Sequence, residues 1–254
     1  MRFDRDSPIY VLHVDDDPAF LDLVSRFLER TDQGITVVSV DDAAAALDRL
    51  EEDDRIECVL SDYEMPGMDG LEFLSCVRDR CPTLPFILYT GRGDEGIAAE
   101  AITQGVDDYI KKDVDTTHYL KLGVRIRREV TRARAEREAE TRLAALETAR
   151  EGICIVDARG RINYANEAYL DLYGYERAEL LGEPWQRLHP DEEVDLITHE
   201  VLPHVEEHGE WSGERVGVRS DDTAFRESKS VAALPNGGLV IVVTAYQHAP
   251  TPQG

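Results

Sequence analysis

Residues 11–18 read VLHVDDDP, an apolar run that ends in three consecutive carboxylates with no lysine or arginine beside them. Neighbouring carboxylates repel one another, and burying them without a counter-charge costs free energy. A divalent cation would supply that counter-charge, because hard cations such as Mg²⁺ prefer carboxylate oxygen. A solvated acidic loop is the alternative, and the rest of the sequence has to decide between the two.

Five short apolar runs alternate with amphipathic segments between residues 9 and 112. The segments have apolar residues three and four positions apart, whereas the runs have the length of buried strands. The runs are IYVLHV (9–14), ITVVSV (35–40), IECVL (56–60), LPFILYT (84–90) and DDYIKK (107–112). This alternation predicts an α/β domain with a five-stranded, doubly wound parallel sheet. The ligand site of such a domain lies beyond the carboxyl ends of its strands.

Chemically reactive side chains stand at the ends of four of these runs. Asp15 and Asp16 follow the first run, and Asp62 follows the third. Thr90 ends the fourth run, and Lys112 ends the fifth. A carboxylate oxygen can attack a phosphoryl group and form a mixed anhydride, while a divalent cation, a lysine and a hydroxyl hold the phosphoryl oxygens. The sequence therefore predicts a phosphoryl-transfer site at this edge of the sheet.

The motifs around these residues are specific. VLHVDDDPAFLDLVSRFL, LSDYEMPGMDGLEF, ILYTGRG and QGVDDYIKKD closely resemble the receiver domain of two-component response regulators, a flavodoxin-like fold, over residues 8–118. The resemblance implies that Asp62, in DxxMPxxDG, is the phosphoacceptor. It also implies a Mg²⁺ site, in which Asp16 is a direct ligand and Asp15 binds through water. Asp62 and the backbone carbonyl of Glu64 would complete the protein ligands.

The resemblance further assigns a conformational switch. Thr90 would move toward the acyl phosphate, and Tyr109 would then turn inward. The phosphate-binding lysine lies three residues after that tyrosine, which selects Lys112 over its neighbour. Asp113 follows where the family commonly has proline, so the cis peptide often found there does not carry over. Asp17 is expected to cap the helix that follows it and not to bind metal.

A hydrolase is the alternative interpretation of the acidic run. Asp15-x-Asp17 also fits the DxD start of haloacid-dehalogenase-type phosphohydrolases, which use the same aspartyl-phosphate chemistry. That family has Gly and then Thr or Val after the second Asp, whereas Pro18 and Ala19 follow here. It also does not predict the motif around Asp62. We therefore expect a phosphoacceptor with Mg²⁺-dependent self-phosphorylation and dephosphorylation only, and no further enzymatic activity.

A connecting helix is predicted over residues 119–141. Arginines and glutamates interleave there, and pairs such as Glu138 with Arg142 stand four residues apart, which is typical of an exposed helix. A parallel dimer stalk is the alternative for this segment. The helix would join the receiver to whatever follows it.

Residues 142–247 resemble a PAS domain, a second, α+β domain with an antiparallel sheet. GICIVDARGRINYAN (152–166) has the pattern of strand, turn and strand, and three longer strands joined by hairpin turns follow a helical middle. Asn166 in YANEA and Gly182 in ELLG stand at places characteristic of the family. Residues 248–254 are expected to be a disordered tail.

The residues identify no ligand for the PAS domain and leave open that it has none. The flavin-photosensor motif around a reactive cysteine is absent from the helical middle, and Cys154 is expected in the core because it lies in the first strand. His189 could ligate haem, but its place before Pro190 favours a structural role. Four aromatic residues either line a pocket or pack in the core: Trp185, Tyr164, Tyr169 and Tyr173.

Composition limits the partners. Asp and Glu number 52 against 28 Lys and Arg, a formal net charge of -24. Such a surface repels nucleic acid and anionic membranes, and it is similar to that of halophilic archaeal receiver–PAS proteins. No apolar run reaches the ~20 residues that span a bilayer, and MRFDRDSPIY lacks a signal-peptide core. The four cysteines, without CxxC spacing, are expected to be reduced thiols.

These observations predict a cytoplasmic two-component signal transduction protein. A sensor histidine kinase would phosphorylate Asp62, and the helix would couple the receiver to a sensory or interaction module. The alternative is a phosphate sink or scaffold whose PAS domain only docks partners. A homodimer through the receiver, the helix or the PAS domain is left open, and so are the cognate kinase and the downstream target.

Overall fold

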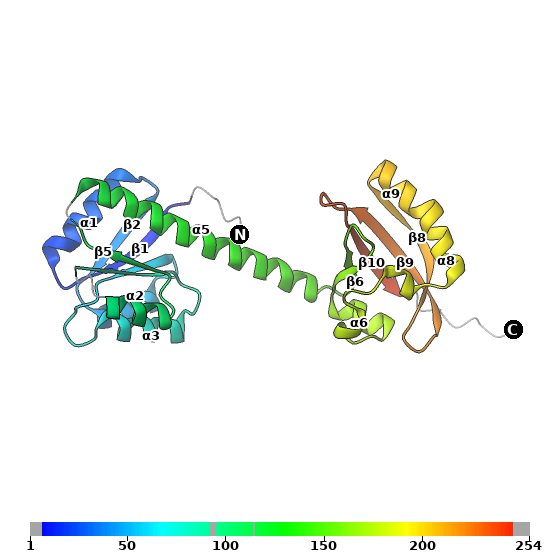
Figure 1. Ribbon diagram of the computed structural model, residues 1–254, viewed down its shortest axis with the longest axis horizontal. Coiled ribbons are helices and arrows are strands. Elements are labelled where there is room, and N and C mark those ends of the chain that lie inside the picture. The colour runs from blue at the N-terminus through cyan, green and yellow to red at the C-terminus, as the bar shows by residue number, and fades with distance from the viewer. Residues whose placement is uncertain (1–6, 92–94, 114, 246–254) are drawn as a thin grey trace. The chain divides into compact units, whose positions relative to one another are not determined.

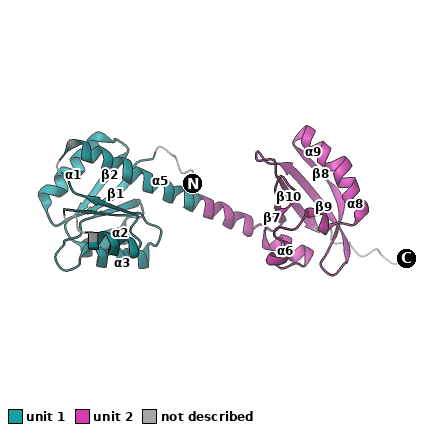
Figure 2. Cartoon of the chain, viewed as in Figure 1, with its two compact units in different colours: residues 1–138 teal, residues 139–254 magenta. Residues whose placement is uncertain are grey.

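The computed structural model describes residues 7–91, 95–113 and 115–245. The chain divides into two compact units, Met1–Glu138 and Ala139–Gly254, which Figure 2 distinguishes by colour. The tail expected to be disordered, residues 248–254, lies outside the described residues.

The described part of the first unit is an α/β domain with a parallel sheet of order β2-β1-β3-β4-β5 (Figure 1). Its elements are β1 (Ile9–Val14), α1 (Pro18–Thr31), β2 (Ile35–Val40), α2 (Ala43–Glu52), β3 (Ile56–Ser61), α3 (Gly70–Arg80), β4 (Phe86–Thr90), α4 (Glu95–Thr103), β5 (Asp108–Lys111) and α5 (Thr116–Glu147). The predicted five-stranded, doubly wound sheet is confirmed. The strand order reverses between β1 and β3, which opens a crevice at their carboxyl ends.

Each face of this sheet carries its own apolar core. On one face, α2, α3 and α4 cover Leu12, Val59 and Leu88. On the other, α1 and α5 cover Val11 and Ile87. A strand that is buried on both faces has apolar residues at nearly every position, and this is why these strands appear as continuous apolar runs in the sequence.

Helix α5 begins on the parallel sheet and crosses the boundary between the two units. Its buried residues Tyr119, Leu122, Ile126 and Val130 are three or four positions apart and pack on the sheet. Beyond that stretch the helix is polar, as the sequence indicated. Of the described helices, none is long and apolar enough to cross a bilayer.

The described residues of the second unit form an antiparallel sheet of order β7-β6-β10-β9-β8, with helices on one side (Figure 1). The elements are β6 (Gly152–Val156), β7 (Ile162–Ala165), α6 (Glu167–Tyr173), α7 (Arg177–Leu180), η1 (Trp185–Leu188), α8 (Asp191–Leu196), η2 (Ile197–Val201), α9 (Leu202–His208), β8 (Glu210–Val218), β9 (Ala224–Ala233) and β10 (Leu239–Ala245). The expected α+β domain, with two short strands, a helical middle and three longer strands, is confirmed.

The helical stretch from α8 to α9 contains a π-helical turn, η2, where Leu202 N–H donates to the carbonyl of Ile197. Pro203 follows directly. Proline has no N–H and its ring clashes with the carbonyl four residues earlier, so an ordinary α-helical turn is disfavoured there. The sequence pattern predicted helix through this stretch but not the wider turn.

Candidate functional site

Strand pairing brings the acidic residues together at one edge of the parallel sheet. β1 and β3 are adjacent and parallel, with Val14 opposite Ser61. Asp15 directly follows β1, and Asp62 directly follows β3. The Asp62 N–H group donates a hydrogen bond of 2.8 Å to the Val14 carbonyl. The two carboxylates therefore start from neighbouring points at the crevice.

The local backbone fixes how each carboxylate lies. Asp17 caps α1, and its side chain accepts hydrogen bonds from the N–H groups of Ala19 and Phe20, which confirms its expected capping role. Asp17 N–H in turn donates to Asp15 Oδ1 at 3.1 Å, and Tyr63 N–H donates to Asp62 Oδ1 at 2.8 Å. Backbone donors thus hold one oxygen of each of the two buried carboxylates.

Lys112 connects those two carboxylates. Its Nζ lies 2.6 Å from Asp15 Oδ2 and 3.1 Å from Asp62 Oδ2. Asp15 is 1% exposed and Asp62 is 7% exposed. Burial raises the pKa of Asp62, while Lys112 opposes that rise. The site therefore holds a buried carboxylate whose free oxygen already faces a cation.

The donor set at this edge fits a divalent cation. Asp15, Asp16 and Asp62 each offer an oxygen within 4.8 Å of the others. Two of these side chains are buried, and Lys112 is the one cation that the described residues place in ion pairs with them. Three carboxylates against one ammonium leave an excess of negative charge, and all three are the hard oxygen ligands that Mg²⁺ takes. Asp16 and Glu64 line the same surface hollow beside this cluster.

The switch residues expected from sequence lie on the neighbouring strands. Thr90 ends β4 and is 1% exposed, and its carbonyl accepts a hydrogen bond of 2.7 Å from Lys112 N–H. Tyr109 is half-buried in β5 and packs against the apolar core of the α3 face. Among the described residues no peptide bond is cis, and this includes the bond between Lys112 and Asp113. The roles of these residues in switching stay predictions.

Sequence reasoning missed two neighbours of the site. The Phe20 ring lies under Lys112, with Nζ 4.4 Å from its centroid, which favours a cation there. Gly70 begins α3 so close to the site that a Cβ atom would lie 2.4 Å from the Asp62 carbonyl oxygen. The sequence places Phe20 in the first turn of the helix that follows Asp16. It does not indicate that the Phe20 ring contacts Lys112, which is distant along the chain.

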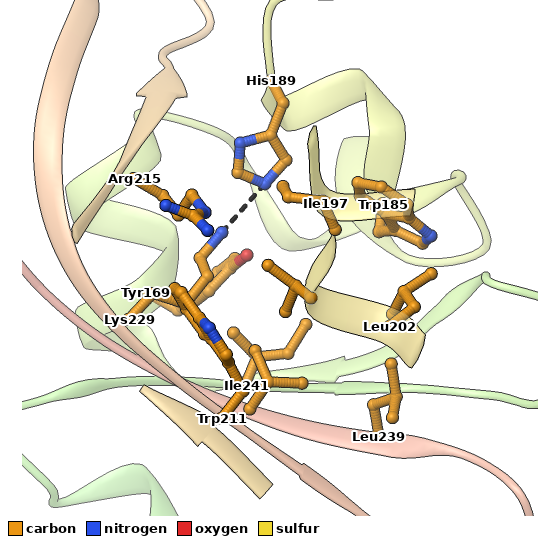
Figure 3. A pocket seen from close by; sticks show the side chains of 12 residues that line it. Tyr169, Trp185, His189, Ile197, Leu202, Trp211, Arg215, Lys229, Leu239 and Ile241 are labelled. Atoms are coloured by element: carbon orange, nitrogen blue, oxygen red, sulfur yellow. Dashed lines mark hydrogen bonds between the residues drawn. The ribbon is translucent and has the colours of Figure 1, made fainter. Parts of the chain in front are cut away.

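The second unit holds its expected residues in the core. Cys154 is fully buried and has a free thiol, and burial raises its pKa to about 12. His189 has both ring nitrogens occupied: Nδ1 lies 2.8 Å from the Val216 carbonyl and Nε2 lies 2.9 Å from Lys229 Nζ (Figure 3). Both ring nitrogens thus have partners within the unit, which is consistent with the structural role that the sequence favours. Tyr169 and Tyr173 pack in the core, and Trp185 joins them.

An ionic network in this core was not foreseen. Lys229 Nζ lies 2.6 Å from Glu227 Oε1, and Tyr173 O–H donates to the other oxygen of Glu227. Glu227 is fully buried and Lys229 is 4% exposed. The signal was present in the sequence, because alternation along AFRESKSVAA puts both charged residues on the face of Val231.

Comparisons with known proteins give the same division of the chain. Residues 11–122 match the Response regulator receiver domain family, and residues 140–225 match the PAS fold family. The Transcriptional regulatory protein FixJ of Bradyrhizobium diazoefficiens is 38% identical over 104 residues, which cover 41% of this chain and 48% of FixJ. The Response regulator protein FleR of Pseudomonas aeruginosa is 40% identical over 115 residues, which cover 45% of this chain and 24% of FleR.

Among solved structures, a CheY-like response regulator receiver domain protein from Methanospirillum hungatei is 28% identical, with a TM-score of 0.46, and the match covers 51% of this chain and 99% of that one. The chain therefore spans about half of the length of FixJ (48%) and about a quarter of the length of FleR (24%). The matches to those relatives thus cover one part of the chain. That part carries the acidic site, and together the family matches show that the chain has a response regulator receiver domain followed by a PAS domain.

Proposed function

We propose that Asp62 is phosphorylated by a sensor histidine kinase and that the receiver passes this signal to the PAS domain through α5. The observation that carries the proposal is the geometry at Asp62. Its carboxylate is buried beside Asp15, has one oxygen 3.1 Å from Lys112 Nζ, and stands at the edge that collects Asp16 and Thr90. These are the groups that phosphoryl transfer to a carboxylate needs.

The proposed step is an in-line displacement. An Asp62 oxygen attacks the phosphorus of a phosphohistidine, the N–P bond breaks, and the departing imidazole takes up a proton. Lys112 leaves its ion pairs with the carboxylates and holds a phosphoryl oxygen, while Thr90 donates its hydroxyl to another. A bound Mg²⁺, held by Asp15, Asp16, Asp62 and the Glu64 carbonyl, would neutralise phosphoryl charge. Attack by water on phosphorus later returns Asp62 and phosphate.

The proposed output uses the elements next to the site. Thr90 ends β4, Tyr109 lies in β5, and α5 follows β5 directly, so a change at Thr90 reaches α5 through adjacent elements. At its other end α5 is held by the PAS unit, where the Asn166 amide donates to the Leu146 carbonyl at 2.9 Å. The protein would thus act as a phosphoacceptor in the cytoplasm, with no nucleic acid or membrane as a partner and no enzymatic activity beyond its own phosphorylation and dephosphorylation.

Intact-mass spectrometry of the full chain tests this proposal. The chain is incubated at high salt with Mg²⁺ and acetyl phosphate, beside the Asp62→Asn variant and beside a sample with chelator. One added phosphoryl group on the wild type, absent from both controls, supports the proposal. Equal uptake by Asp62→Asn would contradict it. A histidine kinase that has phosphorylated itself serves as a second donor, since some receivers accept phosphate only from a kinase.

A further inference from the structure

The continuous helical stretch of the PAS unit, residues 191–208, carries carboxylates and imidazoles but no fixed positive charge. It contains aspartates, glutamates and the histidines His199, His204 and His208, and it contains no lysine or arginine. Its last part, α9, packs beside β8 and β9 (Figure 1). An acidic surface of this kind attracts cations, and imidazole adds a nitrogen ligand that suits transition metals.

Two of these histidines stand one helical turn apart on the exposed side of α9. Val205 is buried, whereas His204 and His208 are exposed. Their rings are stacked, with centroids 4.2 Å apart and 17° between the ring planes. Histidines at positions i and i+4 on one helix face form a spacing that holds Zn²⁺ in proteins. The two rings therefore lie close enough to share one ion.

A backbone hydrogen bond fixes the proton of one ring. His208 Nδ1 lies 3.1 Å from the His204 carbonyl oxygen, which can only accept, so Nδ1 carries the proton in the neutral ring. The lone pair then belongs to Nε2, the nitrogen that can bind a metal. Metal-binding histidines commonly donate their other ring N–H to a carbonyl or a carboxylate. His208 is thus in the tautomer that a metal ligand needs.

The surroundings of the pair also favour a cation. His208 is the last residue of α9, and the C-terminal end of a helix stabilises positive charge. Glu207 is 79% exposed and adjoins His208, and Glu200 stands four residues before His204, so carboxylates are at hand to complete the ligands. Imidazole and carboxylate with water is a zinc-type donor set. We propose that His204 and His208 bind one divalent transition-metal ion of the class of Zn²⁺, Ni²⁺ and Cu²⁺.

This ion differs from the Mg²⁺ of the first unit in its chemistry and in its place. Asp15, Asp16 and Asp62 offer oxygen alone, whereas the histidine pair offers nitrogen, which Mg²⁺ seldom takes. An ion that bridges one turn of α9 binds the folded PAS unit and so stabilises it. The inference goes beyond the proposed function, because this metal input does not pass through Asp62. Its failure would leave phosphorylation of Asp62 untouched.

Titration calorimetry of the full chain with Zn²⁺, at high salt and in excess Mg²⁺, gives the first test. His199→Gln is the matched control: His199 is exposed in the same stretch and its Nδ1 lies 2.8 Å from the Asp195 carbonyl oxygen, but Pro203 stands four residues after it. His204→Gln and His208→Gln should each bind Zn²⁺ at least about tenfold more weakly than the wild type, since each leaves one imidazole. His199→Gln should bind as the wild type does.

Three results would overturn the proposal: no binding of Zn²⁺ to the wild type, unchanged affinity in His204→Gln and His208→Gln, or an equal loss in all three variants. The substituted side chains are exposed, so these variants should keep their fold. Phosphate uptake at Asp62, measured on the same preparations, should be the same in all of them.

Urea unfolding followed by tryptophan fluorescence places the ion in the PAS unit, which holds both tryptophans of the chain. Zn²⁺ should raise the unfolding midpoint of the wild type and of His199→Gln but not that of His204→Gln. Ca²⁺, which takes oxygen ligands, should raise none of them. A Zn²⁺ shift in His204→Gln as large as in the wild type, or a Ca²⁺ shift as large as the Zn²⁺ shift, would contradict the site.

Discussion

Replacing Lys229 by methionine should strongly destabilise the PAS unit. Methionine keeps the length of the side chain but removes the charge that pairs with Glu227, a residue with no exposed surface. Breaking a buried ion pair by removing one partner costs about 3–5 kcal/mol. Against a typical domain stability of about 5–15 kcal/mol, this is a large share. The unpaired carboxylate, not the lost attraction, carries most of the cost.

The double variant Lys229→Met/Glu227→Gln separates these two contributions. Glutamine keeps an oxygen that can accept from Tyr173 O–H but has no charge to leave unpaired. We expect the double variant to be more stable than Lys229→Met alone, with a coupling energy of about 2 kcal/mol. An exposed pair between β9 and the neighbouring strand β8 provides the control: Arg226 and Glu214 lie 3.9 Å apart with side chains 71% and 57% exposed. Arg226→Met should cost at most about 1 kcal/mol.

Tryptophan fluorescence during urea unfolding measures these changes in the PAS unit alone. The chain has two tryptophans, and both Trp185 and Trp211 lie in this unit. With a slope of about 1–3 kcal/mol per molar urea, a cost of about 3–5 kcal/mol in Lys229→Met should lower the midpoint by about 1–5 M. If Lys229→Met costs no more than Arg226→Met, or if the double variant is no more stable than Lys229→Met, then the pair does not behave as a buried charge pair and the reasoning is wrong.

Three further predictions address the rest of the account. Asp17→Ala should cost the receiver about 1 kcal/mol of stability, measured by circular dichroism, because the substitution removes a helix cap. The Asp17→Ala variant should still take up phosphate, whereas Asp16→Ala should not. The opposite pattern of phosphate uptake would show that the roles of the two residues are reversed. Gly70→Ala should destabilise the receiver by about 1–3 kcal/mol in the same assay, because its Cβ would meet the Asp62 carbonyl oxygen at 2.4 Å. The pKa of His189 falls from 6.5 to about 3 on folding, so the unfolded chain binds the proton first and the PAS unit loses stability as pH drops below about 6.5. At pH 5 this amounts to about 2 kcal/mol relative to His189→Gln, and parallel stability curves for the two proteins would refute it.

The receiver could be predicted from its sequence almost element by element, for a physical reason. Strands buried on both faces show as unbroken apolar runs, and parallel strands place their carboxyl ends at one edge. Asp15, Asp62 and Lys112 therefore had to meet once the strand order was known. Asp17 could be distinguished from these site residues because an aspartate directly before a proline is a local pattern typical of a helix N-cap.

Contacts that depend on packing could not be predicted. The Phe20 ring contacts Lys112, and Gly70 lies against the backbone of Asp62. Both contacts depend on how closely the helices pack on the sheet. In the PAS unit, alternation in β9 indicates that Glu227 and Lys229 face the core, but it does not indicate that they pair with each other or that Lys229 also contacts His189. The π-helical turn before Pro203 fits the chemistry of proline, but the sequence pattern indicated only a helix there.

The most direct measurement of the central claim locates the phosphoryl group. The chain is phosphorylated with Mg²⁺ and acetyl phosphate and treated at once with borohydride, which reduces an acyl phosphate to an alcohol and so converts the modified aspartate into homoserine. Peptide mass spectrometry then reads the position. We predict homoserine at Asp62 and at no other aspartate, in an amount that falls when Mg²⁺ is chelated. Homoserine at Asp15, Asp16 or any other aspartate, with Asp62 intact, would contradict it.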